Sequence, residues 1–271
     1  MLRRVAQGHE SQAATFGDEL VELRTYKPST WKGEGVLLHF HGLGRHPSDE
    51  IASLTHLAEG SGHMVVAPYF DPTRFPNWRY QALGIMNQGS PRPREKWTGD
   101  FIIQLVRELE ALEGPGMAVR LIGHSAGGQF VERFAAFHSV GAVCLIAANP
   151  ASVLMPSRDY RYPYGFGGLP DDFAGDDAIA AYLRQPLVLY VGALDDQSQG
   201  TPDNRPEAMR QGGTRPQRAQ FAFETGQAIA QEHGWAFNWR FVSRSGVGHR
   251  LFGMFGDAFG YDVVFNGSPE G

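Results

Sequence analysis

The stretch Arg120-Leu121-Ile122-Gly123-His124-Ser125-Ala126-Gly127-Gly128 decides the fold class of this chain. Apolar residues before it predict a short strand over 119–122, and the amphipathic pattern after it predicts a helix over 126–138. A strand that turns sharply into a helix exposes the side chain at the turn, and the turn is so tight that its neighbours must be small. Gly123 and Gly127 meet that demand. We therefore interpret Ser125 as a nucleophile.

The rest of the chain alternates strands with helices. Strands are predicted over 20–26, 35–40, 63–68, 142–148, 187–191 and 236–242, and helices over 47–60, 97–113 and 215–233. Short apolar strands separated by helices indicate a mostly parallel central sheet with helices on both faces. We expect one α/β domain over residues 1–271. The stretches 150–175 and 197–214 follow predicted strands and are interpreted as a lid or substrate loops, or as plain surface loops.

Composition limits the partners. The formal net charge is -5, so the chain carries no basic signature of nucleic-acid binding. The longest apolar run, 140–148, is too short for a membrane helix, and the first residues have no apolar core of a signal peptide. The one cysteine, Cys144, lies in that apolar run and is interpreted as a buried strand residue. We expect a cytoplasmic protein with a small-molecule partner, no cofactor, and no sequence signal for the oligomeric state.

A serine nucleophile needs a base, and the base needs an orienting acid. At an elbow of this kind the three residues follow in the order serine, acid, histidine. Three histidines follow Ser125, but His138 and His233 lie at predicted helix ends. His249 lies in the loop Ser245-Gly246-Val247-Gly248-His249 after the last predicted strand, so we assign it as the base.

The acid is expected in the stretch Gly192-Ala193-Leu194-Asp195-Asp196, directly after the strand predicted over 187–191. Adjacent residues in a turn point in different directions, so one of the two aspartates faces His249. The residues alone leave Asp195 and Asp196 open.

The oxyanion that forms during acyl transfer is stabilised by backbone N–H donors. One donor is expected from Ala126, the residue after the nucleophile, and the second from Leu43 in the loop after the strand at 35–40. His39 and His41 flank this region and also admit a metal pair. No third ligand stands at a familiar spacing, so we expect no metal.

These motifs resemble the α/β-hydrolase superfamily in type and order: His-Gly-Leu-Gly at 41–44, Gly-His-Ser-Ala-Gly-Gly at 123–128, Gly-Ala-Leu-Asp at 192–195 and Gly-Val-Gly-His at 246–249. Within it, the chain is similar to polyhydroxybutyrate-depolymerase-like and feruloyl-esterase-like proteins. The resemblance implies that Asp195 is the acid and that the protein cleaves a carboxylic ester through an acyl-enzyme intermediate. Because the sequence shows no signal peptide and no paired cysteines, we expect a small soluble ester rather than a polymer.

Aromatic residues are candidates for the substrate pocket, foremost Trp78 and Tyr164, although ordinary packing explains each equally well. The same triad also serves acyltransferases and amide hydrolases, and a non-catalytic binder on the same scaffold is a further alternative. The nature of the acyl acceptor separates the first two from an esterase. Ligand binding without turnover identifies the third.

Overall fold

The computed structural model describes residues 2–196 and 202–267. Its centre is an eight-stranded sheet with the order β1-β2-β4-β3-β7-β8-β9-β10. The strands are β1 (Gly8–Phe16), β2 (Glu19–Lys27), β3 (Gly35–Phe40), β4 (Met64–Tyr69), β7 (Ala118–His124), β8 (Cys144–Ala148), β9 (Leu187–Gly192) and β10 (Arg240–Arg244). The six strands from β4 to β10 are parallel, and β2 and β1 extend the edge in antiparallel pairing.

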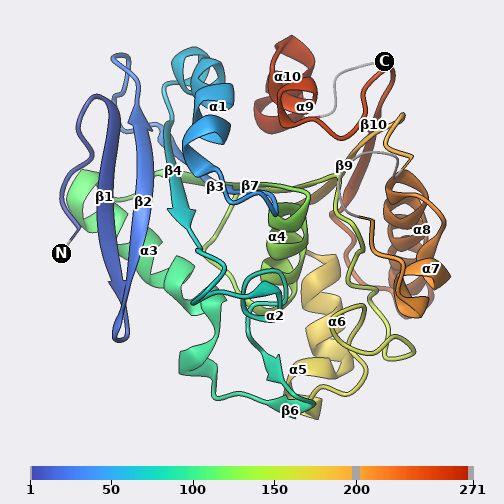
Figure 1. Cartoon of the computed structure of the whole chain (residues 1–271). Coiled ribbons are helices and arrows are strands. Elements are labelled where there is room, and N and C mark those ends of the chain that lie inside the picture. The colour runs from blue at the N-terminus through green and yellow to red at the C-terminus, as the bar shows by residue number, and fades with distance from the viewer. Residues whose placement is uncertain (1, 197–201, 268–271) are drawn as a thin grey trace.

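Helices cover both faces of the sheet, as Figure 1 shows. One face carries α1 (Pro47–Ser61), α9 (Leu251–Phe255) and α10 (Ala258–Phe265). The other carries α3 (Thr98–Glu113), α4 (Ala126–Phe137), α6 (Asp176–Leu183) and α8 (Arg215–His233). Shorter helical segments are α2 (Asn77–Tyr80), η1 (Arg94–Lys96), α5 (Asp171–Ala174) and α7 (Pro206–Gln211), and β5 (Met86–Asn87) pairs with β6 (Ser90–Pro91).

The apolar core is divided by the sheet because successive side chains of a strand point to opposite faces. In β3, Leu37 packs with the α1 face and Leu38 with the α4 face. Both are fully buried, and every residue of β3, β8 and β9 is buried. The prediction of a parallel sheet covered on two sides is confirmed.

Some elements differ from the sequence prediction. β1 was not predicted, because this edge strand carries polar residues on its exposed side and lacks an apolar run. The strand expected over 236–242 begins only at Arg240. The helices α9 and α10 lie in a glycine-interrupted segment that masks their apolar periodicity. Within 2–196 and 202–267, no helix has the length and apolarity needed to cross a membrane.

Candidate active site

Ser125 lies at the turn between β7 and α4, with φ 57° and ψ −112°. A side chain rarely adopts this left-handed backbone, which costs of the order of 1–3 kcal/mol and persists only where packing enforces it. The enforcement comes from the glycines on either side. A Cβ on Gly123 would lie 2.0 Å from the carbonyl oxygen of Gly127, and a Cβ on Gly127 would lie 1.8 Å from that of Phe40. Only glycine fits at these two positions, so the turn holds Ser125 outward.

His249 reaches Ser125 from the loop after β10. Its Nε2 lies 3.0 Å from Ser125 Oγ, and its Nδ1 lies 2.6 Å from Asp195 Oδ2. Asp195 follows β9 and is buried, whereas the neighbouring Asp196 is exposed. Of the two aspartates that the residues alone left open, Asp195 is the one that faces His249.

Arg215 is a member of this cluster that the sequence did not reveal. Its Nη1 donates to Asp195 Oδ1 at 2.6 Å, and both side chains are fully buried. Arg215 is the first residue of α8, whose start is fixed by a capping box between Thr214 and Gln217. The carboxylate of Asp195 is thus held on one oxygen by His249 and on the other by Arg215. A capping signal at 214–217 marked the helix start, but nothing marked the guanidinium as a partner of the acid.

A second imidazole lies beside the first. The rings of His124 and His249 have centroids 4.8 Å apart. Burial and, second to it, the nearby His249 lower the pKa of His124 to about 3. His124 therefore stays neutral near pH 7.

The loop after β3 lies against the nucleophile, because a Cβ on Gly42 would lie 3.9 Å from Ser125 Cβ. Leu43 lines the same cavity as Ser125, and Ala126 is the buried first residue of α4. Both predicted oxyanion donors therefore flank the serine. At a helix N-terminus the first N–H groups have no partner within the helix, which suits the amide of Ala126 to an anion.

Glu50 on α1 fixes this loop and was also missed by the sequence analysis. Its Oε1 accepts from the amide of Gly42 at 3.0 Å, and its Oε2 lies 2.7 Å from His39 Nε2. Burial opposes the charged form of Glu50, but the bonds from His39 and Gly42 outweigh it, so the pKa is lowered. Glu50 is therefore an anion that holds the backbone N–H of Gly42, the residue before Leu43.

His41 holds the same loop from the other side. Its Nε2 accepts from the amide of Phe70 at 3.1 Å, so Nδ1 carries the proton and donates to the carbonyl oxygen of Gly42 at 3.0 Å. Burial lowers the pKa of His41 to about 4, which keeps it neutral. His39 and His41 each have a protein partner of their own, Glu50 for His39 and the backbone of Gly42 and Phe70 for His41.

A cavity of about 560 Å³ opens beside Ser125. Its other lining residues are Leu43, Asn77, Gln81, Gln129, Ala151 and 202–206. Of the aromatic candidates, Trp78 lies outside this lining, with the Arg92 guanidinium 5.1 Å from its ring. Tyr164 is buried behind the lining and donates from its hydroxyl to Asp203 Oδ2 at 2.8 Å. Direct substrate contacts of these two residues stay predictions.

The two loops expected to contact substrate differ. In 150–175 the backbone is tied to the core, since the amide of Val153 donates to Gln211 and that of Leu154 to Glu132. Of this stretch, Ala151 reaches the cavity lining. In 197–214, residues 202–206 line the cavity and 206–211 form α7, while 197–201 lie outside the described residues.

No family model and no curated protein matches the chain. Solved structures do match. A poly(3-hydroxybutyrate) depolymerase from Bordetella parapertussis aligns at a TM-score of 0.88 and 27% identity, covering 98% of this chain and 93% of its own. The chain has the α/β-hydrolase fold. A poly(aspartic acid) hydrolase from Sphingomonas sp. KT-1 aligns at 0.86 and 27% identity over 96% of this chain and 100% of its own.

The resemblance to the α/β-hydrolase superfamily and to its depolymerase-like members is therefore confirmed. An S-formylglutathione hydrolase from Agrobacterium tumefaciens, at a TM-score of 0.57 and 14% identity, shares the fold. The depolymerase and the poly(aspartic acid) hydrolase, each 27% identical to this chain, support a hydrolase at the level of the reaction class.

Proposed function

We propose that this protein is a serine hydrolase that cleaves a carboxylic ester through an acyl-enzyme intermediate. The observation that carries the proposal is the chain of hydrogen bonds from Ser125 Oγ to His249 Nε2 and from His249 Nδ1 to Asp195, at 3.0 and 2.6 Å. A nucleophile, a base and an orienting carboxylate in this order are what acyl transfer requires.

In the first half-reaction, Ser125 Oγ attacks the ester carbonyl carbon as His249 Nε2 takes its proton. The negative charge that forms on the carbonyl oxygen is stabilised by the amides of Leu43 and Ala126. The tetrahedral intermediate then expels the alcohol, which receives the proton from His249. In the second half-reaction, His249 takes a proton from water, the water oxygen attacks the acyl carbon, and Ser125 leaves with the proton returned to it.

Labelling and turnover test the proposal. A fluorophosphonate should label folded protein at Ser125, and Ser125→Ala should lose both the label and the hydrolysis of p-nitrophenyl esters. Ser139→Ala, an exposed serine beyond the end of α4, is the matched control and should keep both. Unlabelled folded wild-type protein, or full turnover in Ser125→Ala, would contradict it.

An amide bond is the second candidate for the scissile bond. It is favoured by the similarity to the poly(aspartic acid) hydrolase, because such a polymer joins its units through amides. The chemistry is the same except that His249 delivers its proton to an amine leaving group. Product analysis of matched ester and amide substrates separates the two, and added alcohol or amine acceptors reveal acyl transfer. A cytoplasmic location stays a prediction that cell fractionation tests.

A further inference from the structure

Two carboxamide side chains lie one helical turn apart on the wall of the cavity. Asn77 begins α2, and the backbone N–H of Gln81 donates to the backbone carbonyl oxygen of Asn77. Residues four apart on a helix share a face. Both side chains line the cavity that contains Ser125. Which atom each amide presents to the cavity is decided by its other partners.

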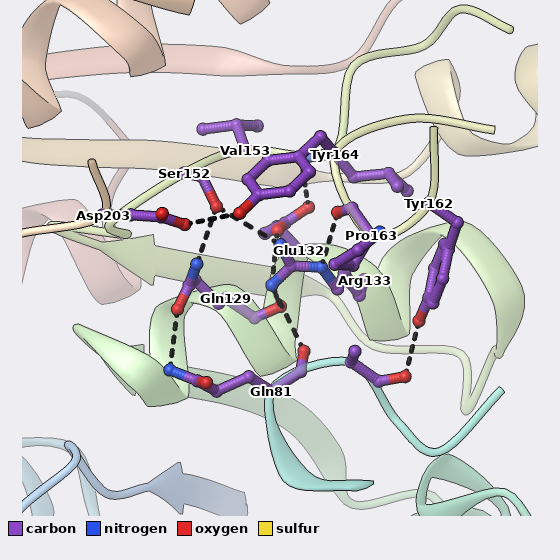
Figure 2. A network of polar contacts seen from close by, with 12 residues as sticks. Gln81, Gln129, Glu132, Arg133, Ser152, Val153, Tyr162, Pro163, Tyr164 and Asp203 are labelled. Atoms are coloured by element: carbon purple, nitrogen blue, oxygen red, sulfur yellow. Dashed lines mark hydrogen bonds and ion pairs between the residues drawn. The ribbon is translucent and has the colours of Figure 1, made fainter. Parts of the chain in front are cut away.

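Gln81 belongs to a polar network, shown in Figure 2. Its Nε2 donates to Gln129 Oε1 at 2.9 Å, and Gln129 Nε2 donates to Ser152 Oγ at 2.8 Å. The nitrogen of the Gln81 amide is therefore engaged. Within the described part of the chain its Oε1 has no protein partner. Gln81 thus presents an acceptor to the cavity.

Arg133 on α4 holds this network in place from behind (Figure 2). Its Nη1 donates to the backbone oxygens of Gln81 and Gln129 at 3.2 and 3.1 Å, and its Nε donates to that of Pro163 at 3.0 Å. The guanidinium is fully buried. A network tied down in this way fixes the direction of the Gln81 amide before any substrate binds.

The side-chain amide of Asn77 is turned the other way from that of Gln81, with its oxygen bonded to the protein. Its Oδ1 accepts from Nη2 of Arg45 at 3.4 Å, and the same Nη2 donates to the carbonyl oxygen of Phe75 at 3.2 Å. Because a guanidinium only donates, Asn77 must turn its oxygen to Arg45 and its nitrogen away. Among the residues described, Asn77 Nδ2 has no protein partner. Asn77 thus presents a donor.

A donor from Asn77 and an acceptor from Gln81, one turn apart, complement a secondary amide. We propose that the substrate carries such an amide, whose C=O accepts from Asn77 Nδ2 and whose N–H donates to Gln81 Oε1. This deepens the proposed function and rests on it. An alkyl group in the same place leaves the two amides without partners, which disfavours it.

Isosteric ester pairs test the assignment on both sides of the scissile bond. Ethyl N-acetylglycinate against ethyl pentanoate places the amide in the acyl group. 2-Acetamidoethyl acetate against pentyl acetate places it in the alcohol. For each ester, kcat/KM is divided by its rate constant for hydroxide hydrolysis, so that the ratio within a pair reports recognition alone. We expect at least one pair to favour the amide by about tenfold.

Two variants test the proposed roles of Asn77 and Gln81. Asn77→Asp keeps an oxygen for Arg45 and replaces the donor by an acceptor. Gln81→Met keeps the volume and removes the acceptor. Each should lower the amide ratio, measured within that variant, by about three- to tenfold. The matched control is Gln220→Met on α8, whose amide is exposed and donates to Glu224.

Turnover with ratios near one in both pairs overturns the amide assignment and leaves the serine hydrolase intact. A preference that survives in Asn77→Asp and Gln81→Met also overturns it. Absence of turnover together with unlabelled Ser125 overturns the proposed function and the amide assignment with it. A preference confined to one pair supports the assignment and tells which half of the substrate carries the amide.

Discussion

Arg215 Nη1 donates to the oxygen of Asp195 that His249 does not use, and both side chains of this ion pair are fully buried. With a bond on each oxygen, the carboxylate is held in one orientation. It therefore holds the imidazole of His249 in place, with Nε2 toward Ser125. Arg215 is thereby a positioning residue that acts through Asp195.

We expect Arg215→Gln to lower kcat about tenfold or more with little change in KM, because Asp195 then loses the bond on one of its two oxygens and orients His249 less well. Loss of a buried charge partner also destabilises the fold by roughly 3–5 kcal/mol, so Arg215→Lys, which keeps the charge, is measured beside it.

Arg218 is the matched control for Arg215. It lies one turn along α8, is equally buried, and donates to the backbone oxygens of Gly212 and Ala151. Arg218→Gln should cost stability without lowering kcat. An unchanged kcat in folded Arg215→Gln would reduce Arg215 to a structural role.

The sequence predicted the parts of this site that local rules dictate. The elbow at Ser125 needs small neighbours, and the loop at His249 has glycines before it, so both were visible in the chain. The parts it missed depend on tertiary contacts. Glu50 and Arg215 both reach the site from the first turn of a helix whose pattern looks ordinary, and no spacing connects them to Ser125. The edge strand β1 was missed for a related reason, since partners rather than propensity form it.

Glu50→Ala should lower kcat by about ten- to a hundredfold with little change in KM. Removing one oxyanion donor from a hydrolase costs about a hundred- to a thousandfold, and loss of Glu50 loosens such a donor without deleting it. The measurement is steady-state hydrolysis together with the rate of fluorophosphonate labelling at Ser125. Both should fall together, because the ester oxygen and the phosphonate oxygen that gain charge are bound by the same backbone donors.

Glu59 provides the comparison on the same helix. It is exposed and accepts from the hydroxyl of Tyr26, far along α1 from the loop at Gly42. Glu59→Ala should leave kcat and labelling at wild-type values. Equal losses in both variants would show that α1 acts only through its packing.

Gly127→Ala should remove activity and lower the stability by more than about 4 kcal/mol, because its Cβ would lie 1.8 Å from the backbone oxygen of Phe40. Backbone atoms of a buried strand cannot give way as a flexible side chain does. Gly175→Ala is the control, since the nearest atom to its Cβ lies at 3.4 Å and its φ is −72°. Thermal melts and ester turnover of the two variants give the comparison. A folded, active Gly127→Ala would contradict the geometry of the elbow.

Glu132 makes the stability depend on pH. Burial raises its pKa to about 7, against the opposing effect of Arg133, whose Nη1 lies 3.3 Å from Oε1. The folded protein therefore holds this proton more tightly than the unfolded chain does. Protonated Glu132 makes its full contribution to the free energy of unfolding below the ordinary pKa of a glutamate. That contribution is lost as the pH rises through about 7. Between about pH 5 and pH 8 the loss amounts to roughly 2–3 kcal/mol.

Glu132→Gln should remove that pH dependence, because an amide stays neutral while its oxygen still accepts from the amide of Leu154, as Glu132 Oε2 does. Relative to wild type, we expect the free energy of urea unfolding of the variant to rise by roughly 2–3 kcal/mol between about pH 5 and pH 8. The difference isolates Glu132 because buried neutral histidines such as His41 and His124 contribute alike to both proteins. Glu224→Gln, on the exposed side of α8, should follow wild type at both pH values. If the free energies of unfolding of Glu132→Gln and wild type differ by the same amount at both pH values, Glu132 is ionised in the folded protein throughout.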